Sequence, residues 1–196
     1  TPPRKLLDLR GFHLEHDIKN DGAIALAHRD GALHIQAREQ SFGIMLHEED
    51  IHGAGRLRLH WGISDYPEGA AYEHGVDNEA IMVYVFFGHE KFSSGSMFVP
   101  DAPYFIGFYL CRDGTDELEV AYEGHYYEKS GRYICVAHPE EGRKVVTEID
   151  FHEEFRKSFD LDRAPSISAV SVEVDTTDSA NDGHAAAFIE RLEFLP

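Results

Sequence analysis

Short apolar segments with a two-residue period, separated by turn-forming residues, constrain the fold of this sequence more than any other feature. Residues 56–63 alternate apolar and polar side chains, which is typical of a strand with one buried face and one wet face. Residues 81–87 are apolar on both faces, so they predict a central strand. Residues 23–28 and 33–37 flank an Asp-Gly pair, which is the sequence of a tight hairpin turn.

The same pattern recurs along the rest of the chain. Further strands are expected at residues 43–46, 104–111, 118–122, 133–137, 145–149, 167–174 and 185–195. About ten to twelve short strands with closely spaced turns indicate an all-β protein, an antiparallel β-sandwich or jelly roll. The 196 residues contain no internal repeat or linker, so a single domain over residues 1–196 is expected.

One segment near residues 150–160 has the period of a helix. Phe151, Phe155 and Phe159 recur every four residues, which places them on one helical face. Asp150 followed by Glu153 matches a capping box at the start of that helix. The sequence therefore predicts one short helix that packs against one end of the sandwich.

The charge balance restricts the partners. Thirty-six acidic and eighteen basic residues give a formal net charge of −18. Such a surface repels phosphates and anionic lipid head groups, so nucleic acid is excluded as an expected partner. No apolar run approaches the roughly 18 residues that span a bilayer, so membrane insertion is not expected either.

The two cysteines and the start of the chain bear on the compartment. Cys111 and Cys135 both lie in apolar, strand-like segments, and we favour two buried thiols over a disulfide. A disulfide between two strands is the alternative, and it would indicate an oxidising compartment. The sequence begins Thr-Pro-Pro-Arg without an initiator Met, which fits either a trimmed chain or a mature chain after removal of a signal peptide.

Two parts of the sequence resemble a bacterial family known as domain of unknown function 3047. Residues 61–63 and 76–87 are similar to its Trp-containing strand, acidic turn and Val-Tyr-Val-Val-Phe strand, although Asn78 stands where the family has a second Asp. Residues 148–159 and 167–195 resemble its Glu-bearing strand end, helical segment and terminal Asp-rich turn and strand. The resemblance implies a secreted or periplasmic β-sandwich similar to carbohydrate-binding and lectin-like domains, with no established activity.

Two acidic turns are candidates for a metal site. Asp77, Asn78 and Glu79 precede the most apolar strand, and Asp175 and Asp178 follow another. If these two strands are antiparallel neighbours, the turns meet and supply the oxygen ligands that calcium prefers. A calcium site is therefore one interpretation of these residues. The other, which we favour, is that these side chains only make turns and cap strand ends.

Aromatic and polar side chains suggest a ligand site. Sugar rings stack on aromatic faces while polar groups hold their hydroxyls. Trp61 is assigned to the core because it shares a strand face with Leu57 and Leu59. The candidate ligand-binding residues are Arg56, Arg58, His60, Tyr84, Tyr109, Tyr126 and Tyr127.

The expected function is an extracytoplasmic, non-catalytic module that binds carbohydrate or a similar polar ligand. No nucleophile elbow or phosphate-binding loop is present in the sequence, and the 13 His residues do not form a local metal motif. The alternatives are a jelly-roll enzyme that degrades polysaccharide, as a lyase or a hydrolase, and an accessory subunit of a larger complex. For the lyase, Arg56, Arg58 and His60 would act beside Tyr84.

Overall fold

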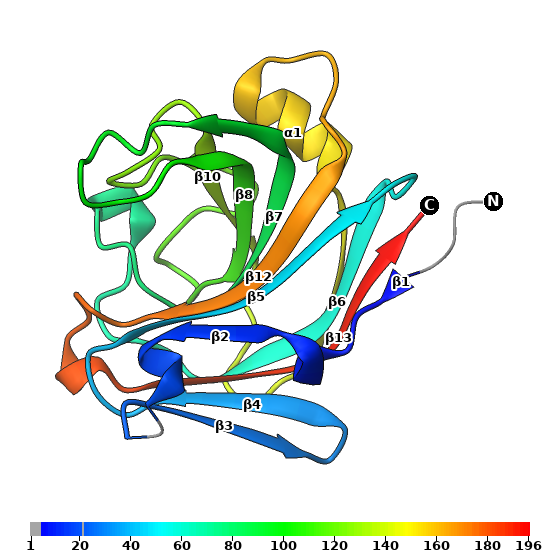
Figure 1. Ribbon diagram of the computed structural model, residues 1–196. Coiled ribbons are helices and arrows are strands. Elements are labelled where there is room, and N and C mark those ends of the chain that lie inside the picture. Colours follow the sequence, from blue (N-terminus) through cyan, green and yellow to red (C-terminus); the bar gives the residue numbers. More distant parts are fainter. Residues whose placement is uncertain (1–4, 21) are drawn as a thin grey trace.

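The computed structural model describes residues 5–20 and 22–196, which form two stacked β-sheets (Figure 1). Residues 1–4, which bear on the removal of a signal peptide, lie outside the described residues. One sheet has the strand order β11-β6-β13-β4-β3, with β1 paired to β13. Its strands are β1 (Lys5–Leu6), β3 (Ile24–Arg29), β4 (Ala32–Ala37), β6 (Arg56–Asp65), β11 (Val145–Asp150) and β13 (Ala185–Leu195).

The second sheet has seven strands in the order β2-β5-β12-β7-β8-β10-β9. They are β2 (His13–His16), β5 (Phe42–Ile51), β7 (Glu79–Phe92), β8 (Ala102–Leu110), β9 (Ala121–Tyr122), β10 (Gly131–Ala137) and β12 (Ile167–Asp175). Short helical turns lie between strands: η1 (Leu9–Gly11), η2 (Asp17–Lys19), η3 (Tyr72–His74) and η4 (Asn181–Gly183). The predicted β-sandwich fold class is confirmed.

The core lies between the two sheets. From the six-stranded sheet, Leu57, Leu59 and Trp61 on β6 are fully buried. The indole nitrogen of Trp61 donates a hydrogen bond to Thr147 Oγ1 at 2.9 Å, so its one polar atom is satisfied. The assignment of Trp61 to the core is confirmed.

The predicted helix is present as α1 (Phe151–Phe159). Asp150 is its N-cap and accepts a hydrogen bond from the Glu153 backbone N–H at 2.9 Å. Phe155 packs on Phe87 with the ring centroids 4.8 Å apart. In Figure 1 the helix covers one end of the sandwich, above β7 and β12. In the part of the chain that is described, no helix is both long and apolar enough to cross a membrane.

Strand pairing agrees with the sequence in two places and differs in one. β3 and β4 form the predicted hairpin, in which Asp30 and Gly31 both have positive φ. β7 is central, between β12 and β8. β8 and β10, however, are parallel. The long excursion between them carries β9 and returns the chain to the same end of the sheet, a connection that strand patterns alone do not show.

Candidate functional site

The outward face of the seven-stranded sheet is built of aromatic side chains. On β7 the alternation sends Ile81, Val83 and Val85 into the core. Tyr84, between them, belongs to a separate buried cluster on the other face. This explains why residues 81–87 are apolar on both faces: one face closes the core and the other forms the wall of a groove.

The groove has a volume of about 690 Å³, within the range of ordinary ligand sites. Strands β2, β5, β7, β8, β10 and β12 contribute to it, together with the loops that join them. Its apolar surface consists of Phe42, Ile44, Leu46, Tyr72, Tyr84, Phe86, Phe98, Val99, Pro100, Ala102, Phe105, Tyr126, Tyr127 and Tyr133. Its polar surface consists of Glu15, His16, Asp77, Asp101, His125, Ser171, Glu173, Asp175, Thr177 and Asp178.

Two of the groove aromatics are strongly exposed. Phe98, in the loop between β7 and β8, is 93% exposed, and Tyr126 is 47% exposed. The base of the Phe98 loop is fixed, because the Ser94 hydroxyl donates to the Val99 carbonyl at 2.7 Å. The Tyr127 backbone N–H also donates to the Ser94 carbonyl at 3.1 Å. Exposed rings on an anchored loop are available to stack on a ligand without first being ordered.

Two carboxyl groups meet beneath this wall. Glu79 pairs with Asp175 across β7 and β12, while Glu173 pairs with Met82, so the two glutamates lie diagonally on neighbouring strands. Their side chains hydrogen-bond to each other. Glu79 and Glu173 are 2% and 9% exposed. Glu79 Oε1 accepts no hydrogen bond from any described donor. A proton held between the two carboxyl groups would supply the missing donor.

Burial raises the pKa of both glutamates. Burial raises the pKa of Glu173 from 4.5 to about 8, with hydrogen bonds from Glu79 and Tyr84 opposing the shift and the charge of Asp175 adding to it. The pKa of Glu79 is also well above 4.5, because of burial first and then the charges of Glu173 and Asp175. Tyr72 opposes this shift by donating to Glu79 Oε2 at 2.7 Å. The pair therefore retains a proton at neutral pH.

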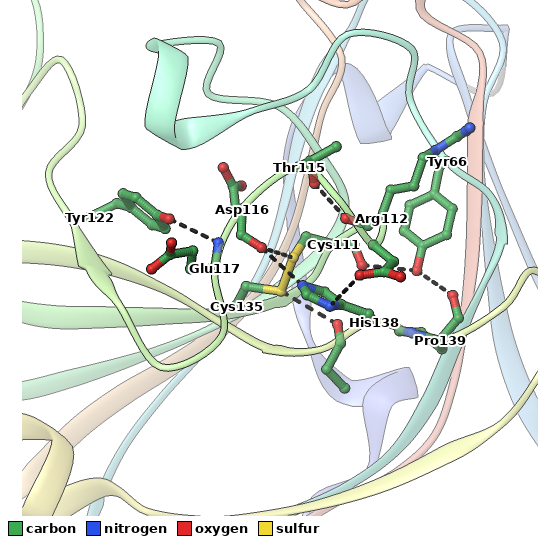
Figure 2. Close-up of polar contacts among 12 residues, drawn as sticks. Tyr66, Cys111, Arg112, Thr115, Asp116, Glu117, Tyr122, Cys135, His138 and Pro139 are labelled. Atoms are coloured by element: carbon green, nitrogen blue, oxygen red, sulfur yellow. Dashed lines mark hydrogen bonds and ion pairs between the residues drawn. A yellow bond between two sulfur atoms is a disulfide. The ribbon is translucent and has the colours of Figure 1, made fainter.

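A second polar cluster holds Tyr72 in place. Asp116, 4% exposed, accepts hydrogen bonds from the Tyr109 hydroxyl at 2.7 Å and from the Tyr72 backbone N–H at 3.2 Å. A disulfide joins Cys111 and Cys135 next to it, and Figure 2 shows Asp116 beside this disulfide. The favoured interpretation, two buried thiols without a disulfide, is therefore wrong. The cause is the β8–β10 pairing, which places the two apolar segments side by side.

His138 lies against the same disulfide (Figure 2). Its ring Nε2 is 2.9 Å from the Asp116 carbonyl oxygen. Among the described residues, the group of three His, Cys or carboxylate ligands whose atoms lie within 4.8 Å of one another is Cys111, Cys135 and His138. Because the disulfide occupies both sulfurs, this group cannot hold a metal ion through thiolates.

The residues predicted to bind calcium lie at one edge of the groove. Asn78 Nδ2 donates to Asp175 Oδ1 at 3.1 Å, and the Asp178 backbone N–H donates to Asn78 Oδ1 at 3.1 Å. Asp77 accepts a hydrogen bond from the His125 backbone N–H at 3.3 Å. The structure thus brings together Asp77, Asn78, Asp175 and Asp178, while Glu79 points to Tyr72.

The predicted ligand-binding residues divide between the two sheets. Tyr84, Tyr126 and Tyr127 line the groove. Tyr109 belongs to the same aromatic cluster but points to Asp116. The other three, Arg56, Arg58 and His60, lie on β6 in the opposite sheet.

On the outward face of the six-stranded sheet the charges are paired. Arg56 and Arg58 both hydrogen-bond Glu148, with Arg58 Nη2 at 3.0 Å. Glu193 lies 3.8 Å from Arg58 Nη1 and 3.1 Å from Arg191 Nε. Arg56 and Arg58 therefore belong to a network of ion pairs between β11, β6 and β13. They do not lie near Tyr84, which is on the other sheet.

Sequence reasoning missed Glu173 and Phe98 as groove residues. A signal for Glu173 was present, because Ser171, Glu173 and Asp175 recur every second residue and so share one strand face. Phe98 lies in a segment rich in Ser, Gly and Pro, and such a segment carries no pattern that distinguishes a ligand-facing ring from a packed one.

Neither a family model nor a curated protein matches the sequence. Solved structures show distant similarity. A family 12 xyloglucanase from Bacillus licheniformis is 10% identical, covers 86% of this chain and 83% of its own, and has a TM-score of 0.47. The endoglucanase cel12A from Rhodothermus marinus is 10% identical, with 98% and 100% covered and a TM-score of 0.47. A mutant of a family 29 carbohydrate-binding module is 9% identical, with 99% and 92% covered and a TM-score of 0.42.

Proposed function

We propose that the protein binds a carbohydrate chain in the groove of the seven-stranded sheet. The observation that carries the proposal is an open groove of about 690 Å³ whose wall is aromatic and whose edge bears carboxylates. Aromatic faces pack against the C–H faces of sugar rings, and carboxylates accept hydrogen bonds from sugar hydroxyls. Phe98 and Tyr126 would make the first contacts because they are the most exposed of its rings.

Hydrolysis of the bound chain is the second candidate. Glu173 supports it, because a carboxyl group with a pKa raised to about 8 is protonated at neutral pH, as a general acid must be. The carboxyl groups of a glycosidase, however, stand about 5 to 9.5 Å apart to admit the sugar, whereas Glu173 and Glu79 hydrogen-bond to each other. We therefore favour binding without turnover.

A lyase acting on acidic polysaccharides has less support. Such an enzyme needs a cationic or amide group that neutralises the uronate carboxylate. Among the described residues that line the groove there is no Lys or Arg. Arg56 and Arg58 are engaged with Glu148 on the other sheet.

We also propose that the protein works outside the cytoplasm, in the periplasm or after secretion. The Cys111–Cys135 disulfide supports this, because disulfides persist in oxidising compartments. A thiol-alkylation assay on protein trapped in intact cells tests the proposal. Unmodified cysteines in the extracytoplasmic fraction support it, and full alkylation without reduction contradicts it.

A calcium ion at the groove edge stays a prediction. Asp77 and Asp178 have carboxylate oxygens to offer, but Asp175 Oδ1 already accepts hydrogen bonds from Asn78 at 3.1 Å and from the Thr177 hydroxyl at 2.7 Å. A bound ion at a hundredfold excess over its Kd stabilises the native state by about 2.7 kcal/mol. Chelation with EDTA should then lower the melting temperature by several degrees, and an unchanged melt would remove the ion from the account.

Screening on a glycan array, followed by calorimetry on the ligands found, tests the proposed function. Wild-type protein should bind at least one neutral or cationic oligosaccharide, and Tyr126→Ala should weaken that binding. Val146→Ala is the matched control, because Val146 is an apolar side chain 57% exposed on the other sheet. Absence of binding at millimolar concentrations, or equal loss in both variants, would contradict the proposal. Release of reducing ends, lost in Glu173→Gln, would instead favour the hydrolase.

A further inference from the structure

We infer that the groove selects a cationic sugar chain, an oligomer of amino sugars whose amines are free. This inference rests on the proposed function and adds the charge of the ligand. It follows from a groove that combines aromatic faces with carboxylates and, within the described part of the chain, contains no Lys or Arg.

Acidic side chains outnumber basic ones in the groove. Its carboxyl side chains are Glu15, Asp77, Asp101, Glu173, Asp175 and Asp178. Its basic side chains are His16 and His125. His125 Nε2 lies 3.7 Å from Asp77 Oδ2, so one imidazole already faces one carboxylate. Glu173 forms a buried pair with Glu79 that retains a proton. Of the carboxyl side chains in the groove, Glu173 therefore contributes least to the negative charge.

Two of these carboxylates have no partner within the protein. The side chains of Asp101 and Asp178 accept no hydrogen bond from any described group and form no ion pair with one. Both residues are exposed. On the opposite sheet, by contrast, Glu148 and Glu190 are both met by Arg or Lys side chains. The groove therefore presents negative charge to whatever binds there, and a cationic ligand supplies the missing partner.

Asp77 and Asp175 add to this field. Both line the groove together with Asp178, and the Asn78 amide bridges Asp175 and Asp178, because it donates to Asp175 Oδ1 and accepts from the Asp178 backbone N–H. Carboxylates gathered in one small region repel one another. An ammonium group placed among them removes that repulsion, whereas a neutral sugar does not.

The aromatic wall suits the same ligand. An ammonium group over the face of a Tyr or Phe ring is attracted by the ring quadrupole. Tyr84, Phe105 and Tyr133 pack edge-on in this wall, with centroids 5.4 to 6.1 Å apart. A volume of about 690 Å³ exceeds what a single small ammonium ion fills, but it accommodates a few sugar rings. An amino-sugar chain satisfies both the rings and the carboxylates.

Calorimetry with three oligosaccharides of equal length tests the inference: β-1,4-linked glucosamine, its N-acetylated form and the corresponding glucose oligomer. At about pH 5.5 the free amines are protonated. The glucosamine oligomer should bind at least about tenfold more tightly than the other two, and this advantage should shrink as salt rises from about 0.05 to 0.5 M.

Variants locate the effect. Glu15→Gln combined with Asp178→Asn should reduce the affinity for the glucosamine oligomer severalfold more than the affinity for the glucose oligomer. Glu140→Gln combined with Asp113→Asn is the control of equal charge, because these side chains are 86% and 91% exposed and lie outside the groove. Melting curves verify that all variants are folded.

Each outcome has a separate meaning. Equal affinity for the three oligomers overturns the inference and leaves the proposed function standing. No binding of any oligomer, here and on the glycan array, defeats the proposed function itself. Spermine that competes as tightly as the glucosamine oligomer overturns the sugar part of the inference, because the carboxylates would then be binding any polyamine.

Discussion

The two outward faces of the sandwich are made of similar strands but carry opposite kinds of surface. On the six-stranded sheet, Arg56, Arg58 and Glu148 form hydrogen-bonded ion pairs. On the seven-stranded sheet, aromatic rings line a groove and the carboxylates of Asp101 and Asp178 lie without a cationic partner. The first surface is satisfied by its own charges. The second leaves these two carboxylates exposed to solvent.

The difference also concerns burial. Glu148 is exposed, and the nearby Arg58 and Arg56 hold its pKa below 4.5. Glu173 is buried beside Glu79, and burial holds its pKa above 4.5. At neutral pH, a glutamate is thus ionised on one face, at Glu148, and protonated on the other, at Glu173. Experiments that alter each face separately test this difference.

The largest expected effect comes from the disulfide, which ties β8 to β10 in the groove sheet. Cys111 and Cys135 are 24 residues apart, and closing a loop of that length stabilises the native state by about 3.5 kcal/mol in the chain-entropy model. Cys111→Ala/Cys135→Ala should lose about that much free energy of unfolding in urea. Reduction of the wild-type protein should give a matching loss. A loss below about 1 kcal/mol in both would show that the groove sheet does not depend on this bond.

The second effect is a pH dependence that comes from Glu79 and Glu173. Their folded pKa values are raised above 4.5, so between about pH 4.5 and 8 the folded state binds more protons than the unfolded state. Stability from the pair is present at low pH and is lost as pH rises, by up to about 1.4 kcal/mol per pH unit for each proton retained.

The double variant Glu79→Gln/Glu173→Gln should lack this pH-dependent stability. Its free energy of unfolding should therefore fall less than that of the wild-type protein as pH rises from about 5 to 8. Glu140→Gln, exposed and outside the groove, should keep the wild-type slope. Parallel curves for wild-type and double-variant proteins would show that the pair does not hold a proton.

A smaller effect is expected at the rim of the groove. Phe98→Ala should weaken binding of the oligosaccharide by about 1 kcal/mol, a factor of about five. Its stability should not fall, because the ring is 93% exposed and contributes little to the core. Calorimetry together with a thermal melt measures both. Unchanged affinity would mean that the loop between β7 and β8 does not touch the ligand.

The smallest effect is expected on the opposite face. Glu148→Gln removes the acceptor shared by Arg56 and Arg58, but exposed ion pairs contribute little to stability. The melting temperature should stay within about 2 °C of the wild type, and ligand affinity should not change. A marked loss of affinity would show that the ligand binds to the six-stranded sheet and not in the groove.

Local patterns in the sequence predict the fold well. Leu57 and Trp61 alternate with polar residues on a strand, and Asp150 caps a helix whose Phe residues share one face. These features depend on neighbours within a few residues, so the sequence shows them directly. The parallel pairing of β8 with β10 depends on the path of a long connection, which no local pattern records.

The candidate site was predicted only in part, for a related reason. The sequence identifies Tyr84 but not its face, because residues 81–87 are apolar on both sides. The prediction that Tyr84 and Arg58 act in one site is wrong, because the two residues lie on different sheets. The Glu79–Glu173 pair requires the register between β7 and β12. Long-range register, rather than composition, decides which side chains form the site.

Chemical-shift mapping by NMR shows whether the ligand binds to the aromatic face of the seven-stranded sheet. The protein is titrated with the tightest-binding oligosaccharide. We expect the perturbed signals to belong to groove residues such as Tyr84, Phe98, Tyr126 and Asp178. The signals of Arg58 and Glu148, on the other sheet, should not change. Perturbations centred on β6 and β11, with the groove residues unaffected, would contradict it.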